Sequence, residues 1–226
     1  MISLLKTFMR QRFSRGVYDA LKSVRTELSL NSRHRGGVRA AQHYRSRNDL
    51  QLHLGCGPNH KAGWINIDLM DSTADLALDL RERLPFADGS VKHVYSEHAF
   101  EHLTYPHEAN GLLAESLRVL TPGGVFDVGV PDTERAIYDY YVERNAEKLA
   151  RARQLWHKEP WIDLPLHQLN YHFYQGTEHK YAWDYETLSN VLGKAGYVDI
   201  SRRAFDPDLD NQNRSGGLYI RAHKPR

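Results

Sequence analysis

Two histidines near the middle of the chain have the chemistry of a proton acceptor. His98 and His102 follow an apolar run that ends at Ser96, and their four-residue spacing would place both on one face of a helix. Because the pKa of imidazole lies near neutral pH, either side chain can take the proton that a hydroxyl loses as it reacts. A structural histidine bonded to a backbone carbonyl explains each of them equally well.

The same two histidines also have the spacing of metal ligands. Glu97 and Glu101 lie beside them in the chain, which adds two carboxylates to the two imidazoles. The order of a zinc-binding HExxH helix is nevertheless absent. The sequence therefore predicts no metal site here.

Glycines and carboxylates follow the apolar runs that come earlier in the chain. Gly55 and Gly57 stand directly after one such run, where glycines let the backbone turn tightly and approach a ligand. An ordinary tight turn is the alternative. Asp68 ends the next apolar run, and its carboxylate can accept both hydroxyl protons of a ribose. Asp79, which precedes Leu80, can accept a proton from the exocyclic amine of a base.

The spacing of these residues disfavours a dinucleotide-binding oxidoreductase. Asp68 lies only 11 residues after Gly57, which leaves no room for the helix whose amino terminus would face a pyrophosphate. His60 stands where such a fold has its third glycine. A nucleoside without phosphates fits this segment better.

The hydrophobic pattern predicts an α/β fold. Strands are predicted at Leu50–Leu54, Trp64–Leu69, Ala74–Leu80, Val91–Ser96, Val125–Val130, Val198–Ala204 and Gly217–Ala222, and helices at Glu108–Leu120 and Tyr185–Ala195. Strands interleaved with helices indicate a Rossmann-like, mostly parallel sheet with helices on both faces and an antiparallel final strand. This domain spans residues 49–226 and follows an extension of residues 1–48.

The extension is basic and amphipathic. Residues 1–47 contain 11 Lys or Arg and two acids, a net charge of +9 that leaves −7 for the rest of the chain. Apolar residues recur every three or four positions over residues 3–28, which predicts a helix. Its apolar face can pack on its own domain, on a second subunit in a homodimer, or on an anionic membrane surface. Gly36 and Gly37 are interpreted as a solvated joint before the domain.

An aromatic and imidazole-rich stretch lies between the predicted fifth strand and the last helix. We expect a substrate lid at residues 133–180, because long connections often act as binding elements. Core packing is the alternative for its rings. The substrate-binding candidates are His172, Tyr174, His179, Lys180 and Tyr181.

Composition narrows the class of protein. The formal charge of the whole chain is +2, so nucleic acid is an unlikely partner. A single cysteine fits a reducing compartment, and no apolar run approaches the roughly 20 residues that span a bilayer. We expect a cytoplasmic protein, with peripheral contact at the inner face of the membrane as a variant.

Several motifs, taken in order, resemble the class I S-adenosylmethionine-dependent methyltransferases, in the small bacterial branch that includes the type 11 methyltransferase domain. They are Leu52-His53-Leu54-Gly55-Cys56-Gly57, Gly63-Trp64-Ile65-Asn66-Ile67-Asp68, Asp79-Leu80, Leu84-Pro85-Phe86, Ser96-Glu97-His98, Glu101-His102-Leu103 and Pro122-Gly123-Gly124. The resemblance implies that S-adenosyl-L-methionine is the cofactor. It implies further that the cofactor-binding residues are Gly55, Cys56, Gly57, Asp68, Leu69, Asp79, Leu80 and Ser96. Within this set, the glycines would accommodate the methionine portion, Asp68 the ribose, and Asp79 with Leu80 the adenine.

The function predicted from this resemblance is methyl transfer to a small-molecule or glycan-like acceptor. A hydroxyl is the expected acceptor group, because it must lose a proton as it reacts and a histidine can accept that proton. The expected base is His98 or His102. The alternative is a non-catalytic member of the same fold that binds the nucleoside or a partner protein.

Overall fold

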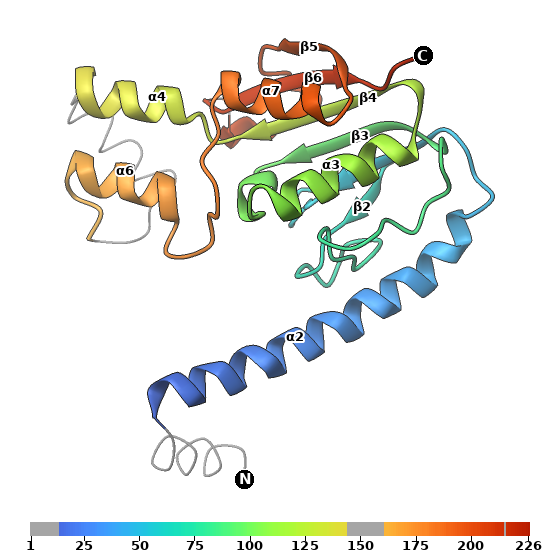
Figure 1. The fold of residues 1–226 in the computed structure, drawn as a ribbon, viewed down its shortest axis with the longest axis horizontal. Helices are drawn as coiled ribbons and strands as arrows, with labels where there is room; N and C mark the ends of the chain where they lie inside the picture. The colour runs from blue at the N-terminus through green and yellow to red at the C-terminus, as the bar shows by residue number, and fades with distance from the viewer. Residues whose placement is uncertain (1–13, 144–160, 215) are drawn as a thin grey trace.

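The computed structural model describes residues 14–143, 161–214 and 216–226. Its core is a six-stranded sheet with the order β2-β1-β3-β4-β6-β5 (Figure 1). The strands are β1 (Leu50–Leu54), β2 (Ile65–Ile67), β3 (Val91–Glu97), β4 (Leu120–Val130), β5 (Val198–Arg202) and β6 (Leu218–His223). None of the described helices is long and apolar enough to cross a membrane.

The strand directions confirm the predicted fold class. The pairs β1–β2, β1–β3 and β3–β4 are parallel, whereas β6 runs antiparallel to both β4 and β5. One predicted strand is much reduced, because residues 74–80 contribute only an isolated bridge between Ile67 and Leu76. The carboxyl ends of β1, β2 and β3 therefore meet at one edge of the sheet, where ligands of such folds bind.

Two helices cover the apolar face of the sheet (Figure 1). They are α3 (His107–Val119) and α7 (Tyr185–Lys194), and their buried side chains belong to one hydrophobic core with the strands. Asp184 caps the start of α7 by accepting a hydrogen bond from the Thr187 N–H group at 2.8 Å. Gly196, with a φ angle of +99°, follows the end of the helix, where a left-handed residue is common.

The opposite face of the sheet is polar and is contacted by the segment between β5 and β6. Its centre is Asp127, whose side chain is fully buried. Asp127 forms ion pairs with Arg203 at 3.0 Å and Arg221 at 2.7 Å, and a hydrogen bond with His93 at 2.8 Å. Arg203 also binds Asp210 at 2.6 Å. A charge network therefore takes the place of hydrophobic contact on this face.

The extension forms the long helix α2 (Arg15–Ala40), followed by a short helix η1 (Ala41–Tyr44). Only the carboxyl-terminal part of α2 lies against the domain (Figure 1). The predicted joint at Gly36 and Gly37 is wrong, because both glycines lie within this helix. A Cβ atom at Gly37 would lie 2.2 Å from the Ala77 carbonyl oxygen, so this glycine permits close helix packing. Residues 3–13 of the predicted helix lie outside the described residues.

The predicted lid is partly helical. Helix α4 (Thr133–Tyr138) continues into the π-helix η3 (Asp139–Glu143), and α6 (Pro165–Tyr174) lies beside α4 in Figure 1. Residues 144–160 of the predicted lid lie outside the described residues.

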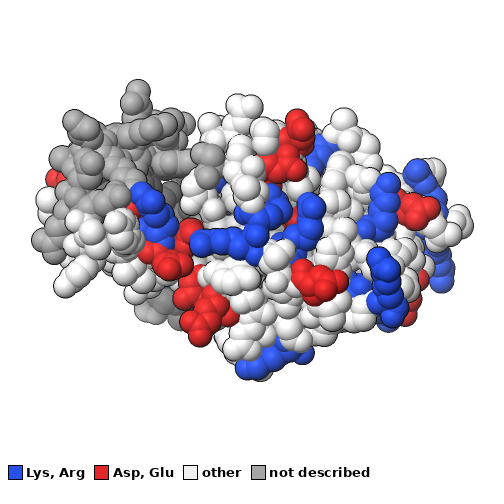
Figure 2. All heavy atoms as spheres, turned by 90° about the horizontal axis from the view of Figure 1, so that it is seen from above, with Lys and Arg blue, Asp and Glu red and all other residues white. Residues whose placement is uncertain are grey.

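Charges are mixed on the face seen from the β5–β6 edge. In Figure 2, Lys and Arg side chains are interspersed with Asp and Glu. This face offers no continuous basic surface to a polyanion, and the absence of nucleic-acid binding stays a prediction.

Candidate functional site

The glycine loop lies at the carboxyl end of β1. Gly55 and Gly57 have positive φ angles of +66° and +49°. A Cβ atom at Gly55 would lie 2.3 Å from the Cβ atom of Ala99, so this glycine permits close contact with the turn that follows β3. A Cβ atom at Gly57 would meet no described atom within 4 Å. The backbone at Gly57 therefore borders open space, as a ligand-binding turn requires.

The Asp68 carboxylate joins the first loop to the second. Its Oδ2 atom accepts a hydrogen bond from the Gly57 N–H group at 2.9 Å. Its Oδ1 atom accepts hydrogen bonds from the N–H groups of Met70 and Asp71 at 2.7 and 2.8 Å. Each carboxylate oxygen has two lone pairs, so Oδ1 is saturated and Oδ2 keeps acceptor capacity for one ligand hydroxyl. Leu69 follows and is half-buried.

Leu80 reaches the glycine loop, whereas the Asp79 carboxylate is already paired. The Cδ1 atom of Leu80 lies 3.9 Å from the position that a Cβ atom of Gly55 would take. Arg81 donates hydrogen bonds to both carboxylate oxygens of Asp79, at 2.9 and 2.7 Å. Burial raises the pKa of Asp79, but the bonds from Arg81 outweigh it, so the net shift is downward. Recognition of adenine by Asp79 stays a prediction.

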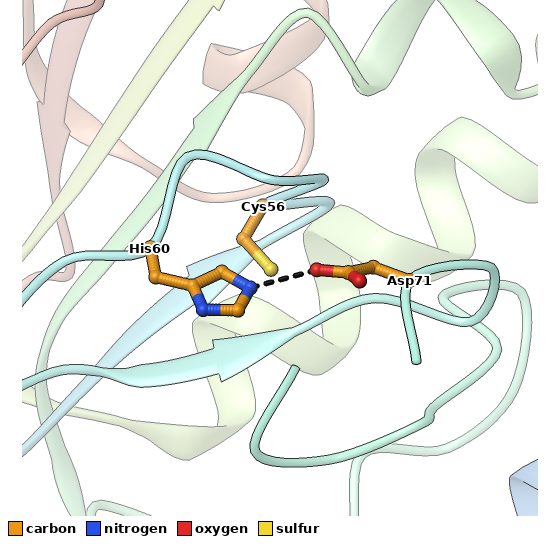
Figure 3. Close-up of side chains that lie close together, drawn as sticks. All are labelled: Cys56, His60 and Asp71. Atoms are coloured by element: carbon orange, nitrogen blue, oxygen red, sulfur yellow. Dashed lines mark hydrogen bonds and ion pairs between the residues drawn. The ribbon is translucent and has the colours of Figure 1, made fainter. Parts of the chain in front are cut away.

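Cys56, which stands between the two glycines, forms a cluster with His60 and Asp71 (Figure 3). Its Sγ atom and ligand atoms of His60 and Asp71 lie within 4.8 Å of one another, and His60 Nε2 is 2.7 Å from Asp71 Oδ2. Burial, followed by the negative charges of Asp68 and Asp71, raises the pKa of the Cys56 thiol to about 12. The free thiol is therefore protonated at neutral pH and is a poor nucleophile.

The turn after β3 brings a histidine and a carboxylate next to the glycine loop. His98 precedes Ala99 and has a left-handed φ angle of 52°, so it lies outside the short helix η2 (Phe100–His102). The predicted helix face shared with His102 is therefore not formed. His98 Nδ1 lies 3.5 Å from Oε1 of Glu101, and burial lowers the pKa of His98 to about 3. Its Nε2 atom is buried and has no hydrogen-bond partner within the described ranges.

Glu101 is a site residue that the sequence did not predict. It is buried, and neither carboxylate oxygen accepts a side-chain hydrogen bond from the described part of the chain. Burial raises its pKa to about 8, close to neutral pH. Its apolar neighbours Phe100 and Leu103 were the available signal, because they indicate a buried turn.

Two further histidines face Glu101 and each other. The rings of His102 and His179 are 5.1 Å apart at 78°. His179 Nε2 lies 4.0 Å from Oε1 of Glu101. The segment that carries His179 is tied to this turn, because the Lys180 N–H group donates to the Glu101 carbonyl oxygen at 2.8 Å. The structure thus brings predicted catalytic and substrate residues together.

The other predicted site residues lie in different surroundings. His172 Nε2 contacts Thr133 Oγ1 at 3.1 Å, whereas the Lys180 ammonium donates to the Thr177 carbonyl oxygen. Tyr174 is exposed, Tyr181 packs on the rings of Tyr105 and Trp183, and Ser96 is buried with its Oγ atom unpartnered among the residues described.

The matched family agrees with this geometry. Residues 52–128 match the model of a family described as a methyltransferase domain. This segment runs from β1 into β4 and contains the glycine loop, Asp68, Asp79 and the turn at His98. This match over residues 52–128 agrees with the resemblance of the motifs to the class I S-adenosylmethionine-dependent methyltransferases, and S-adenosylmethionine is the cofactor of that class.

Individual similar proteins are distant. A protein encoded in a transposon of Streptomyces fradiae, described as uncharacterised, is 29% identical over 113 residues, which are 39% of this chain and 32% of that protein. The chain thus spans about a third of this curated relative. A structure described as a possible exported protein of Bordetella parapertussis has a TM-score of 0.50 and 14% identity, over 86% of this chain and 68% of that one. The structure of a SAM-dependent methyltransferase from Archaeoglobus fulgidus has a TM-score of 0.46 and 14% identity, over 88% of this chain and 94% of that one.

Proposed function

We propose that this protein transfers a methyl group from S-adenosylmethionine to a hydroxyl of a small-molecule or saccharide acceptor. The observation that carries the proposal is the contact between the two loops: the Ala99 Cβ atom lies 2.3 Å from where a Gly55 Cβ atom would be. His98 and Glu101 lie one residue before and two residues after Ala99 in the chain, so both are close to the predicted cofactor turn. Methyl donor and proton acceptor would share one site.

The residues of the glycine loop fit the cofactor. Open space above Gly57 admits a ligand that any side chain there would obstruct. Asp68 presents a carboxylate fixed by three backbone N–H groups, so Oδ2 can accept one ribose hydroxyl without reorganising. When bound, S-adenosylmethionine supplies a methyl group on a positively charged sulfur. Much of the contribution of the chain is then to hold the acceptor in line with that methyl group.

His98 is the residue we propose as the base. Its Nε2 atom has no hydrogen-bond partner among the described residues, so it is free to take a proton. Burial lowers the pKa of His98 to about 3, which keeps the imidazole neutral but makes it a weak base, so the role requires the nearby carboxylate. When Glu101 is ionised, its carboxylate stabilises the imidazolium that forms, since Oε1 lies 3.5 Å from Nδ1. His102, the second candidate, faces His179 instead.

The acceptor would approach from the segment that carries His172 and His179. That segment is tied to Glu101 through the backbone of Lys180, and it offers polar edges on apolar rings, which suit saccharides and other hydroxylated ligands. Hydroxyl acceptors rank above amines, because a neutral alcohol must lose a proton as it attacks and the site holds groups that can take it.

A transfer assay tests this proposal. Radiolabelled S-adenosylmethionine would be supplied with panels of hydroxylated small molecules, saccharides and amines. With an accepted hydroxyl, His98→Gln should lower turnover by about 100-fold or more, while affinity for S-adenosylhomocysteine is kept. His43→Gln, at an exposed position of helix η1, is the matched control. Wild-type turnover in His98→Gln would contradict the assignment of the base, and cofactor binding without transfer to any acceptor would favour the non-catalytic alternative.

We also propose that α2 contacts an anionic membrane surface. Val17, Leu21, Val24 and Leu28 are 43 to 68% exposed and recur at helical spacing, so this stripe does not pack on the described domain. The net charge of +9 over residues 1–47 suits acidic headgroups. The enzyme would then act beside the membrane.

A further inference from the structure

Three potential metal ligands lie close together beside His98, the proposed base. A carboxylate oxygen of Glu101 and one ring nitrogen each of His102 and His179 lie within 4.8 Å of one another. The three residues come from η2 and from the segment after α6, so they are about 80 positions apart in sequence but adjacent in space. This grouping was invisible in the linear motif, which lacks the HExxH order.

Both imidazoles are oriented by a backbone carbonyl. Nδ1 of His102 lies 3.2 Å from the Glu178 carbonyl oxygen, and Nδ1 of His179 lies 2.7 Å from that of His172. A carbonyl can only accept, so we assign the ring protons to Nδ1. The Nε2 lone pairs are left free to bind a ligand. Metal-binding histidines are commonly fixed by such outer hydrogen bonds.

The carboxylate supplies the second observation. Glu101 is buried, yet no other described residue donates a hydrogen bond to either of its oxygens, and the His98 Nδ1 atom lies 3.5 Å from Oε1. A buried carboxylate without a partner is costly, and a cation compensates for that cost. The charge of Arg214 favours the ionised form of Glu101, but its guanidinium group is paired with Glu97, with Nη1 3.7 Å from that carboxylate.

The separations suit one shared ion. His179 Nε2 and Glu101 Oε1 are 4.0 Å apart, which is too long for a hydrogen bond. Two ligand atoms that are each about 2.0 to 2.2 Å from a tetrahedral ion are roughly 3.3 to 3.6 Å apart. The side chains of Glu101, His102 and His179 would therefore move inward to complete the site.

We propose that Glu101, His102 and His179 bind a divalent transition-metal ion. Two imidazoles and one carboxylate form a donor set for Zn²⁺, Co²⁺, Mn²⁺ or Fe²⁺ and leave coordination positions open for water or another oxygen ligand. Ion binding itself is independent of the proposed function. One extension rests on it: an acceptor hydroxyl at an open position would lose its proton more readily. Here His102 and His179 serve as ligands, and His98 remains the base.

Cobalt binding to the full-length chain tests the site. After treatment with a chelator, the protein would be titrated with Co²⁺ and followed by visible absorption and by calorimetry. We expect one equivalent bound at Glu101, His102 and His179, with d–d bands that persist in Cys56→Ser. Glu101→Gln and His179→Ala should each weaken binding to this site at least ten-fold. Cys56→Ser and His60→Ala, in the cluster of Figure 3, are the matched controls.

Two outcomes would overturn the site. One is wild-type protein that binds no Co²⁺ or Zn²⁺. The other is binding that Glu101→Gln and His179→Ala leave intact but Cys56→Ser abolishes, together with a thiolate charge-transfer band. Because Glu101 is buried, each variant would be checked by circular dichroism, and added Zn²⁺ should raise Tm for wild type but not for a folded ligand variant. Ion binding without methyl transfer would contradict the proposed function and leave the site standing.

Discussion

Gly55 and Gly57 share a left-handed backbone but face different surroundings. Gly55 is packed against Ala99, whereas the position of a Cβ atom on Gly57 is open. We therefore expect Gly55→Ala to lower the free energy of unfolding by more than 2 kcal/mol, because it adds a steric clash to the roughly 1 to 2 kcal/mol cost of a left-handed residue.

Gly57→Ala should affect ligand binding more than it affects stability. It would cost only about 1 kcal/mol of stability, yet lower affinity for S-adenosylhomocysteine, because the new methyl group projects into the ligand space. Chemical denaturation and calorimetry on both variants measure the two quantities. Equal ligand affinity in Gly57→Ala and wild type would argue against the cofactor turn.

Single site residues could be predicted where they directly follow a predicted strand. Asp68 and the glycines follow apolar runs, so their meeting at one sheet edge could be expected from topology. Glu101 could not be assigned in this way, since its role depends on burial and on His179, which lies 78 positions later. The pairing of Asp79 with Arg81 was also not predicted, because a side-chain rotamer decides it.

At the scale of elements, the polar face of the sheet depends on β4. Asp127 is fully buried, and although burial raises its pKa, hydrogen bonds from His93 and Arg221 and the charge of Arg203 hold the pKa at about 2. A carboxyl group with a lowered pKa in the folded state adds stability above its unfolded pKa of 3.8. That stability is lost as the pH falls from about 4 towards 2.

Asp127→Asn should accordingly lower the free energy of unfolding by about 3 kcal/mol at pH 7, because two arginines lose their partner. The difference from wild type should shrink below pH 4. Asp19→Asn, at an exposed position on α2, is the control and should change little. Denaturant titrations between pH 2 and 7 measure this, and a constant difference over the whole range would refute the role of the Asp127 charge.

The hydrophobic period predicted α3, α7 and five of the six strands within a few residues. It succeeded because these elements each bury one regular face. It failed for residues 74–80, which add only one bridge, and for the joint at Gly37. Glycine near a helix end indicates either a break or a close contact, and only the position of Ala77 distinguishes them.

At the scale of the whole molecule, the amino-terminal part of α2 extends away from the domain (Figure 1), and its apolar stripe is exposed. Wild-type protein should sediment with vesicles that contain anionic lipid and less with neutral ones, because basic and apolar contacts act together. Leu21→Glu with Leu28→Glu should abolish sedimentation. Ala20→Glu with Thr26→Glu, on exposed positions outside the stripe, adds the same negative charge. This control should weaken sedimentation less than the variant in the stripe does. A dimer that these stripe variants split, without vesicle binding, would contradict the proposal and favour a second copy as the partner.

Binding of S-adenosylhomocysteine to wild type and to Asp68→Asn tests the central claim most directly. The claim is that the loops after β1 and β2 hold the adenosyl cofactor. Loss of a charged hydrogen-bond acceptor costs about 1.5 to 3 kcal/mol, so calorimetry should show affinity reduced by roughly 10- to 100-fold in Asp68→Asn. Asp88→Asn, whose carboxylate is 75% exposed on a distant turn, should bind as wild type does. Wild type that does not bind the ligand, or a folded Asp68→Asn with undiminished affinity, would contradict the account.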